Sequence, residues 1–401
     1  MADTAAAGLG TAGEVFRAFL RLGVTSFGGP VAHLGYFRDD LVARRRWVDE
    51  RVYAELVALG QFLPGPASSQ VGFSLGLTRA GRRGALAAWV AFTMPSALLM
   101  VGFAYGARAF GSVVGRGVVA GLQVVAVAIV AQAVLGMARS LTPDVRRAAI
   151  AVIAGAGVLL LGNPLTQVLA IALGAFAGLA LCRRAEATSP GTLRVPVSRT
   201  AGVAALCLFA TLLVVLPVLA AVTDSRIIDV ADGTYRAGAL VFGGGHVVLP
   251  LLQSAAVGGG WVTPEQFVAG YGAAQALPGP LFAFAAYLGA LALPGPAGLV
   301  TGAVALVAVF LPGFLVLVGV LPFWSSLRTR PSVQAALRGA NAAVVGVLAA
   351  ALIDPVFVTA ITGLATLALA VVCFALLTYW RVPPWGVVLV GAAGGALVAL
   401  V

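Results

Sequence analysis

Long apolar stretches alternate with short charged ones from one end of the chain to the other. A helix needs about 20 apolar residues to cross a hydrocarbon core roughly 30 Å thick, and stretches of this kind recur throughout. The pattern predicts spans near 84–107, 117–138, 148–161, 163–182, 200–222, 299–322, 339–353, 356–378 and 385–400. We therefore expect an all-α polytopic membrane protein whose solvent is the lipid bilayer.

Three sequence elements occur twice. They are a glycine turn at 27–30 and 242–245, a tryptophan at Trp47 and Trp261, and the motif Gln-x-Leu-Pro-Gly-Pro at 61–66 and 275–280. The two tryptophans are as far apart as the two copies of the motif, and we call this spacing the repeat offset; the glycine turns differ from it by a single position. A register held over that distance predicts two homologous halves, 1–199 and 223–401, joined by one extra transmembrane helix at 200–222.

The arginines indicate how the two halves are oriented. In the first half, the segments before and after the proline motif, 38–51 and 79–83, are rich in arginine. The equivalent loops of the second half, around 251–266 and 290–298, contain none. Because arginine collects in cytoplasmic loops, the first pair of loops is expected inside and the second outside. The halves are then inverted-topology repeats.

A segment whose two flanks lie on one side of the membrane cannot cross it. Pro64 and Pro66 divide the first such segment into two arms of about a dozen residues, each long enough for half a bilayer at 1.5 Å per residue. Pro278 and Pro280 divide the second in the same way. We expect a re-entrant helical hairpin in each half.

Composition narrows the functional classes. The formal net charge is +11, and all 25 basic residues are arginines in short loops, so a membrane protein explains the charge better than a nucleic-acid partner does. The first apolar run carries Arg17 and Arg21, unlike a cleavable signal, and predicts a cytoplasmic N-terminus in a bacterial inner membrane. The three cysteines are isolated, so we expect no disulfide, metal site or cofactor.

The helix expected after Pro66 is the strongest candidate for anion binding. Its first N–H groups, those of Ala67, Ser68, Ser69 and Gln70, would point into the break at Gly65, where a helix N-terminus attracts negative charge. The alternative is that the two serines only cap the helix. The second break at Gly279 offers no hydroxyl, so side-chain hydrogen bonds to an anion are expected from the first half.

The remaining candidates lie near these breaks. Glycines let the backbone approach a ligand or a crossing helix, and both readings stay open for the two glycine turns. The further substrate-binding candidates, in and near these turns and at the start of each proline motif, are Ser26, Phe27, Gly28, Gly29, Gln61, Gly243, Gly244, Gly245 and Gln275. Three further residues are candidates for a proton or anion relay, with a solvated or interfacial role as the alternative: His33, Arg38 and His246.

With these motifs in hand, the chain resembles a long-chain member of the chromate ion transporter family. The resemblance rests on 26–33, Arg46-Trp47, 61–70, 242–246, 260–262 and 275–280, and so covers both halves. It implies an inner-membrane efflux carrier for chromate, with sulfate as a related oxyanion, driven by the proton gradient or the membrane potential.

Two other classes compete with an oxyanion carrier: a channel or uptake permease for another small anion, and a membrane enzyme or sensor. An enzyme is disfavoured because the sequence has no nucleophile paired with a base and few ionisable groups inside the spans. Asp354 is the main carboxylate within an apolar region, and Asp354-Pro355 is typical of a helix start. The sequence leaves a homodimer open.

Overall fold

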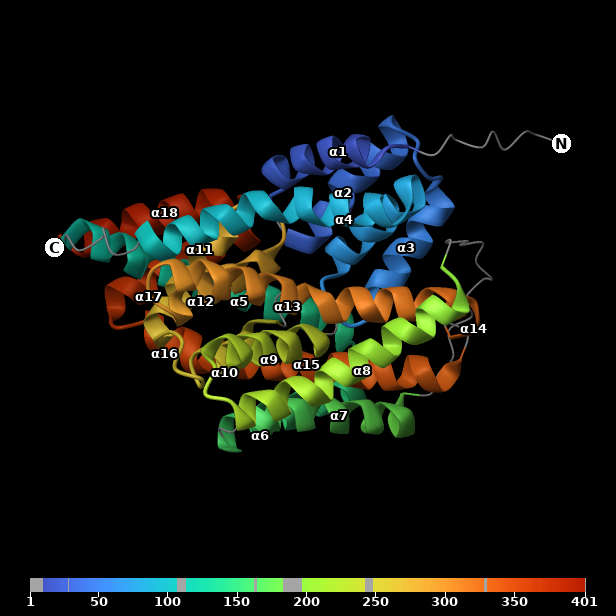
Figure 1. Cartoon of the computed structure of the whole chain (residues 1–401). Coiled ribbons are helices and arrows are strands. Elements are labelled where there is room, and N and C mark those ends of the chain that lie inside the picture. Colours follow the sequence, from blue (N-terminus) through green and yellow to red (C-terminus); the bar gives the residue numbers. More distant parts are fainter. Residues whose placement is uncertain are drawn as a thin grey trace.

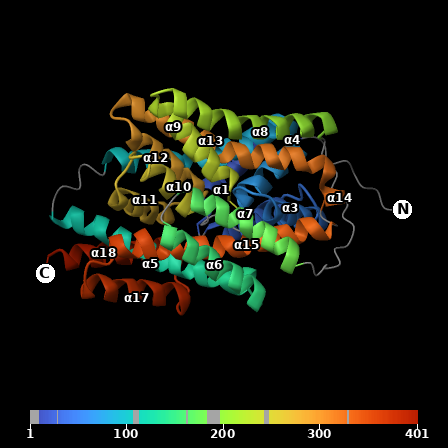
Figure 2. The same cartoon turned by 90° about the horizontal axis from the view of Figure 1, so that it is seen from below.

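The computed structural model describes residues 10–27, 29–106, 113–161, 164–182, 197–241, 248–327 and 330–400. Every regular element in these ranges is a helix, and most helices run side by side along one direction (Figure 1). Figure 2 shows α8 and α17 on opposite outer faces of the bundle.

The first half and the joining helix comprise α1 to α8. Their bounds are α1 Ala12–Thr25, α2 Gly29–Phe37, a π-helical turn Arg38–Arg44, α3 Glu50–Phe62, α4 Ala67–Gly106, α5 Val113–Leu141, α6 Val145–Leu161, α7 Pro164–Leu181 and α8 Arg199–Val222.

The second half comprises α9 to α18. Its elements are α9 Arg226–Ala239, α10 Val248–Ala256, α11 Pro264–Ala276, a 3-10 turn Leu281–Ala283, α12 Phe284–Ala292, α13 Pro296–Val320, a 3-10 turn Leu321–Phe323, α14 Trp324–Leu327, α15 Pro331–Ala351, a π-helical turn Leu352–Phe357, α16 Val358–Ala360, α17 Leu364–Thr378 and α18 Pro384–Val398.

The backbone repeats with the same offset as the sequence. α1 and α9 begin and end at positions separated by the repeat offset, and so do α3 and α11. Three pairs of residues with positive φ are separated in the same way: Arg46 and Gly260, Gly65 and Gly279, Gly81 and Gly295. Since left-handed backbone is uncommon outside turns, the shared positions mark the same chain reversals in both halves.

Each proline motif lies at the tip of a helical hairpin. α3 leads to the first motif and the 67–79 segment of α4 returns from it, after which α4 bends at Ala80 and Gly81 and continues as a straight helix to Gly106. α11 and α12 form the equivalent hairpin, followed by the straight helix α13. Gly76 packs against Gly84 across the bend at Gly81, and Gly298 packs against Ala290 across the turn at Gly295.

The two hairpins point in opposite directions. Gly81, the outer turn of the first hairpin, lies at the start of the straight part of α4, whereas Gly295, the outer turn of the second, accepts a hydrogen bond from Tyr105 near its end (2.8 Å). That straight part, 82–106, is about 37 Å long at 1.5 Å per residue, so the turns lie at opposite ends of the molecule. The repeats are therefore inverted.

The sequence predicted one hairpin per half, and the structure has two. The other is formed in the first half by α1 and α2: Arg79 pairs with Glu14 at the start of α1 (3.1 Å), and Arg38 at the end of α2 pairs with Glu50 (2.9 Å). In the second half, Arg226 at the start of α9 donates to the carbonyl of Gly259 after α10 (2.8 Å). All of these helices have 9 to 14 residues, too short to cross a bilayer.

The halves also exchange a helix. α15 of the second half packs between α6 and α7 of the first, while α5 of the first half packs against α17 and α18 of the second. Small residues form both contacts, because Gly339 lies against Gly174 and Gly178, and Gly391 against Gly121. Close backbone approach through glycine is a common way to pack helices in a membrane. The exchange binds the two halves into one body.

Two predicted spans have different bounds in the structure. The stretch expected at 339–353 is α15, which begins earlier, at Pro331. The stretch expected at 356–378 is broken, because Asp354 adopts an extended conformation and the regular helix α17 begins only at Leu364. Asp354-Pro355 therefore lies in a kink between α15 and α16 rather than at the start of a long helix.

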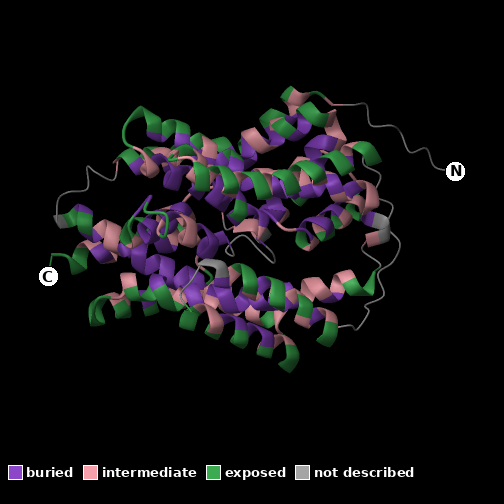
Figure 3. Ribbon diagram, turned by 60° about the horizontal axis from the view of Figure 1, so that its bottom comes forward, coloured by how far each residue is buried: buried purple, intermediate pink, exposed green. Residues whose placement is uncertain are grey.

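The outer surface is apolar. Leu160, Phe176 and Leu364 are 84%, 69% and 85% exposed, and α8 buries only Gly202 and Ala205. Exposed residues line the outside of the bundle and buried ones its centre (Figure 3). Five helices in the described ranges are long and apolar enough to cross a membrane. Exposed apolar surface of this extent fits lipid rather than water, and the chain is a multi-pass membrane protein.

Candidate functional site

The tips of the two inverted hairpins are hydrogen-bonded to the opposite halves. The Gly65 N–H donates to the carbonyl of Val241 (2.7 Å), and the Gly279 N–H donates to the carbonyl of Ser26 (2.9 Å). Gly65 and Gly279 have φ of 118° and 95°, which glycine adopts without strain. Ser26 follows α1 and Val241 follows α9, so four half-length helices end around one centre.

The first break exposes the start of the 67–79 helix. The helix begins at Ala67, and the Gln70 N–H already bonds to the carbonyl of Pro66 (2.9 Å). The free donors are therefore the N–H groups of Ala67, Ser68 and Ser69, for which the described chain supplies no acceptor. The expectation of a free N–H at Gln70 was wrong, because Gln70 is the fourth residue of the helix and its N–H closes the first helical turn.

The Gln70 side chain stabilises the break by donating hydrogen bonds to backbone carbonyls of both halves. Its Nε2 donates to the carbonyls of Pro64 (2.8 Å) and Gly313 (2.9 Å). Gly313 lies on α13, so this amide joins the first break to the second half. Gln70 is 0% exposed, and its Oε1 finds no donor in the part of the chain that the structure describes.

The two serines do not cap the helix. The Ser68 hydroxyl lies 3.3 Å from Nδ1 of His33, and the Ser69 hydroxyl has no partner among the described residues. Both serines are 3% exposed. A capping serine would accept a backbone N–H of the first turn, and neither hydroxyl does so. The capping interpretation is therefore wrong: the Ser68 hydroxyl is shared with His33, and the Ser69 hydroxyl is unpaired among the described residues.

His33 connects the first glycine turn to the first break. It lies on α2 and is 1% exposed, with its ring edge-on to Phe92 at 5.2 Å and Nδ1 at Ser68. No described group completes a hydrogen bond of good geometry to Nε2, although the backbone of Ser26 lies near the ring. The interfacial position is thus excluded for His33, which is a buried partner of Ser68.

Several buried polar atoms around this centre lack a partner within the described ranges. They are Ser26 Oγ, His33 Nε2, Ser69 Oγ, Gln70 Oε1 and Thr93 Oγ1. An unpaired buried polar group costs about 1–3 kcal/mol, and most buried groups in folded proteins are paired. A cluster of such groups indicates a place where a polar ligand or water completes the bonds.

At the positions equivalent to this polar cluster, the second half has apolar side chains. At the repeat offset, Ser68, Ser69, Gln70, Thr93 and Ser96 correspond to Phe282, Ala283, Phe284, Val307 and Phe310. Phe282, Phe284 and Phe310 are at most 2% exposed and belong to one apolar core. The two halves therefore differ in chemistry, because the first carries hydroxyls where the second carries apolar and mostly aromatic side chains.

Thr93 and Ser96 were missed by sequence reasoning. They lie on the straight part of α4, beside the second break: a Cβ placed on Gly279 would come within 2.9 Å of Ser96 Oγ and 3.2 Å of the carbonyl of Phe92. The available signal was a pair of hydroxyls three residues apart on one face of an otherwise apolar span. Only the crossing of the halves brings them to the centre.

Other predicted residues lie away from the centre. Arg38 is at the outer end of α2, where its exposed side chain pairs with Glu50. Gln61 is exposed on α3 and lines a separate cavity with Arg147 and Arg338. Gln275 is half-buried near Tyr271, with its Nε2 unpaired in the described chain. Phe27 is half-buried, with its ring 6.4 Å from that of Trp385, and Gly29 has φ of 78°.

Some predictions cannot be placed. Gly28, Gly243, Gly244, Gly245 and His246 lie outside the described residues.

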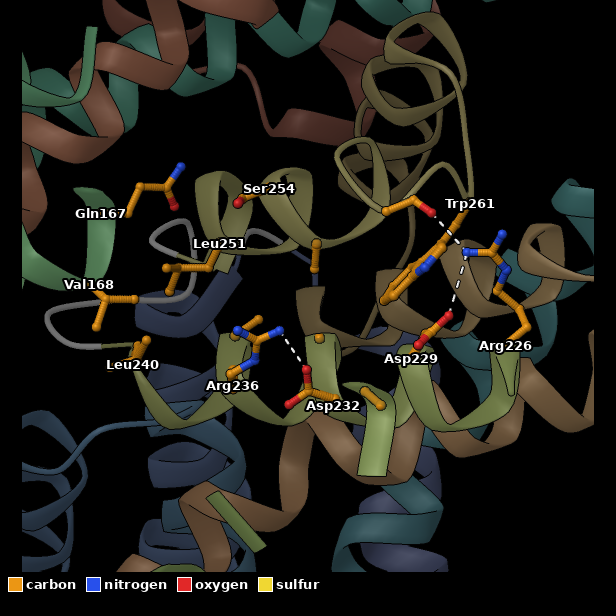
Figure 4. A pocket seen from close by; sticks show the side chains of 15 residues that line it. Gln167, Val168, Arg226, Asp229, Asp232, Arg236, Leu240, Leu251, Ser254 and Trp261 are labelled. Carbon is orange, nitrogen blue, oxygen red and sulfur yellow. Dashed lines mark hydrogen bonds and ion pairs between the residues drawn. The ribbon is translucent and has the colours of Figure 1, made fainter. Parts of the chain in front are cut away.

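A cavity of about 430 Å³ lies at the outer end of the second half, between α9 and α10 (Figure 4). Arg236 pairs with Asp232 across one side of it and Arg226 with Asp229 at the other. Asp232 is the one carboxylate among the buried polar residues of the described chain, and its partner balances its charge. Among the described residues, the central site therefore has no buried carboxylate without a cation partner.

The chain matches the family model described as Chromate transporter over residues 13–179 and again over 228–396. A chromate transport protein of Pseudomonas aeruginosa is 30% identical over 352 residues, covering 86% of this chain and 82% of that protein. A chromate transport protein of Cupriavidus metallidurans is 29% identical over 402 residues, covering 95% and 91%. A probable chromate transport protein of Synechococcus elongatus is 28% identical over 357 residues, covering 84% and 82%.

No solved structure matches the chain. The two matched segments fall on the two inverted halves, and together they cover most of the 401 residues. The chain belongs to the chromate transporter family.

Proposed function

We propose that this protein is a secondary transporter that exports chromate, with sulfate as a related substrate. The observation that carries the proposal is the crossing of the two broken hairpins at Gly65 and Gly279, beside a cluster of unpaired buried hydroxyls. Inverted repeats with broken helices bind substrates near the middle of the membrane, where the repeats meet. Membership of the chromate transporter family and the names of the relatives support chromate as the substrate.

The proposed binding site is the start of the 67–79 helix. Three free N–H groups and the hydroxyls of Ser68 and Ser69 offer donors to the oxygens of a tetrahedral anion, and the helix dipole adds partial positive charge. Hydrogen bonds to a charged group contribute about 1.5–3 kcal/mol each. Because no described arginine reaches this centre, the anion is held by dipoles alone, which favours release as well as binding.

The proposed orientation follows the arginines. Arg38, Arg79 and Arg147 lie at the end of the molecule that holds the outer turn Gly81, which we call the arginine-rich end; Tyr105 and Gly295 mark the opposite end. Because arginine collects on the cytoplasmic side, we assign the arginine-rich end and the N-terminus to the cytoplasm of a bacterial inner membrane. The four hairpins are then re-entrant, two from each side.

The second candidate is a channel or uptake permease for another small anion. Aromatic packing across the centre favours a carrier, because Phe73 stacks on Phe314 at 4.5 Å and Trp89 lies against Phe310 at 5.8 Å, so the two halves close over the site. A carrier alternates between access from the two sides, whereas a channel needs a continuous opening.

The deciding experiment is chromate flux in proteoliposomes made with the purified protein. Uptake of labelled chromate should saturate and should accelerate when the vesicles are preloaded with unlabelled chromate or sulfate. Imposing a pH gradient and a membrane potential separately identifies the driving force. Flux without saturation or counterflow would identify a channel, and sulfate flux without chromate flux would reject the proposed substrate.

A further inference from the structure

A second polar cavity opens at the arginine-rich end, between the two halves. Its volume is about 450 Å³, and its walls come from α3, α5 and α6 of the first half and from α14 and α15 of the second. Gln61 on its α3 wall stands four residues before Gly65, so the cavity extends close to the first break. Binding sites of inverted-repeat transporters lie where the repeats meet, and this cavity lies on the approach to that place.

One face of α15 supplies three of the polar lining residues. Gln334, Arg338 and Asn341 follow one another at intervals of four and three residues and therefore share a helix face. The neighbouring face packs on α7 through Ala335 and Gly339. Polar side chains are costly in lipid, so a polar stripe on this apolar helix indicates water or a solute in the cavity.

The cavity presents hydrogen-bond donors without a lining carboxylate. Arg338 and Arg147 provide two guanidinium groups, and within the described chain Arg338 bonds to the carbonyl (3.3 Å) and Oε1 (3.0 Å) of Gln334. Arg147 is paired with Asp144, which does not line the cavity. The cavity in Figure 4 differs, because each of its arginines pairs with an aspartate that lines it.

Trp324 gives an independent indication of a ligand. It lines the cavity, is 6% exposed and stacks edge-on with Phe62 at 5.1 Å. Its indole N–H is buried, and no acceptor for it exists within the described residues. An indole nitrogen can only donate, so the missing partner must be an acceptor such as an anion oxygen or a water.

The inverted repeat shows that the arginine of this cavity does not stand at the same helix position in the two halves. Gly339 of α15 contacts Gly174 of α7. The equivalent contact in the inverted repeat is between Gly121 of α5 and Gly391 of α18. With these glycines superposed, the position equivalent to Arg338 is Ala120. The same superposition places Arg116 at the position of Gln334, so the equivalent face of α5 carries its arginine one helical turn earlier.

We propose that this cavity is an outer oxyanion site, which captures a tetrahedral oxyanion at the arginine-rich end before it reaches the first break. The oxyanion is held by Arg338, Asn341 and the Trp324 N–H. The inference rests on the proposed function for the identity of the anion, but the cavity's affinity for an oxyanion is a separate property. A phosphate of an anionic lipid headgroup has the same chemistry and is the competing occupant.

The test uses Ser140→Cys, at a lining residue that is not assigned to the anion, in a protein whose three native cysteines are replaced by serine. Modification by the uncharged reagent N-ethylmaleimide is followed in proteoliposomes, with sulfate or chloride added at equal ionic strength. Sulfate should slow modification by about tenfold at saturation. Adding Arg338→Gln should raise the sulfate concentration that gives half-maximal protection by about tenfold or more, since a charged hydrogen bond is lost. Adding Arg338→Lys should restore much of the protection.

Arg330→Gln is the matched control, because Arg330 is an exposed arginine at the start of α15 that does not line the cavity. Protection should be unchanged in this control and also in the Ser68→Ala/Ser69→Ala protein, whose central site is altered. Protection that persists while wild-type chromate flux is absent would support the outer site and reject only the proposed function. Normal chromate flux with no protection by sulfate would overturn the outer site alone.

Vesicle composition separates the two sources of oxyanion. In phosphatidylcholine vesicles alone, sulfate protection should be complete, and adding phosphatidylglycerol should change it less than twofold. Modification that slows with phosphatidylglycerol and ignores sulfate would overturn the proposal in favour of a lipid headgroup site.

Discussion

The Gly279 N–H in the second half donates a hydrogen bond to the carbonyl of Ser26 in the first half, at 2.9 Å. Its counterpart, from Gly65 to Val241, is 2.7 Å long. The N–H group at each break thus donates to a carbonyl just after a half-length helix of the other half. Backbone groups freed at a break inside a membrane must be satisfied by protein or by a water-filled cavity, and this pair meets that need reciprocally.

Alanine at Gly65 or Gly279 should disrupt the crossing. A Cβ at Gly65 would lie 2.8 Å from Cα of Gly313, and one at Gly279 would lie 2.9 Å from Ser96 Oγ. We expect either variant to lose most chromate flux and to unfold at lower temperature in detergent. Gly81→Ala and Gly295→Ala are matched controls, because these glycines also have positive φ (62° each) but nothing within 4 Å of the added carbon. Equal loss in all four variants would show that backbone strain alone matters.

The inverted orientation predicts a pattern of labelling from the two sides. In a protein without native cysteines, Arg45→Cys and Arg82→Cys should react with an impermeant thiol reagent only from the cytoplasm. Thr263→Cys and Pro294→Cys should react only from the periplasm. Labelling of the first two positions from opposite sides would contradict the re-entrant hairpin.

The exchanged helices predict that glycines at their crossing are essential to assembly. A methyl group at Gly339 would collide with the carbonyl of Gly174, whereas Gly157 on α6 has nothing within 4 Å. Gly339→Ala should destabilise the protein by about 1–3 kcal/mol through overpacking. Gly157→Ala should be neutral or stabilising, because alanine is the better helix former by up to about 1 kcal/mol. Thermal unfolding monitored by gel filtration distinguishes these outcomes, and equal stability of the two variants would contradict the exchange.

Chromate oxidises thiols, so a cysteine at the central site should report the passage of substrate. Ser68→Cys should transport chromate at first, lose activity during exposure and regain it with a reductant. Sulfate exposure should do no harm. Of the two methionines on α4, Met94 adjoins Thr93 in the sequence but is 37% exposed, whereas Met100 is buried one turn beyond Ser96. Stable chromate flux through Ser68→Cys would show that Ser68 does not touch the substrate.

Local signals in the sequence were sufficient for the helices, the repeat and the two proline breaks. The hairpin of α1 and α2 was not predicted, because Glu14, Arg17 and Arg21 make α1 resemble a surface helix. Its length was the available clue, since 14 residues give only about 21 Å of helix.

The exchange of α5 and α15 could not be predicted from the sequence. The exchange depends on contacts between glycines of different helices, such as Gly339 with Gly174. Nothing in the hydrophobic periodicity or the charges of the sequence identifies such a partner. For the same reason the partnership of Gln70 with Gly313 in the opposite half and the approach of Ser96 to Gly279 appear only in the folded chain. The candidate motifs were local, whereas their contacts depend on how the halves cross.

The central claim is that an oxyanion is bound at the start of the 67–79 helix, and the most direct test is the chromate concentration dependence of uptake in proteoliposomes. Ser68→Ala/Ser69→Ala should raise the KM for chromate by about tenfold or more, since each lost bond to the anion contributes about 1.5–3 kcal/mol. Ser74→Ala is the control, because Ser74 is equally buried on the same helix but bonds to the Gln70 carbonyl (2.9 Å). An unchanged KM in the double variant, at normal protein levels, would contradict the account.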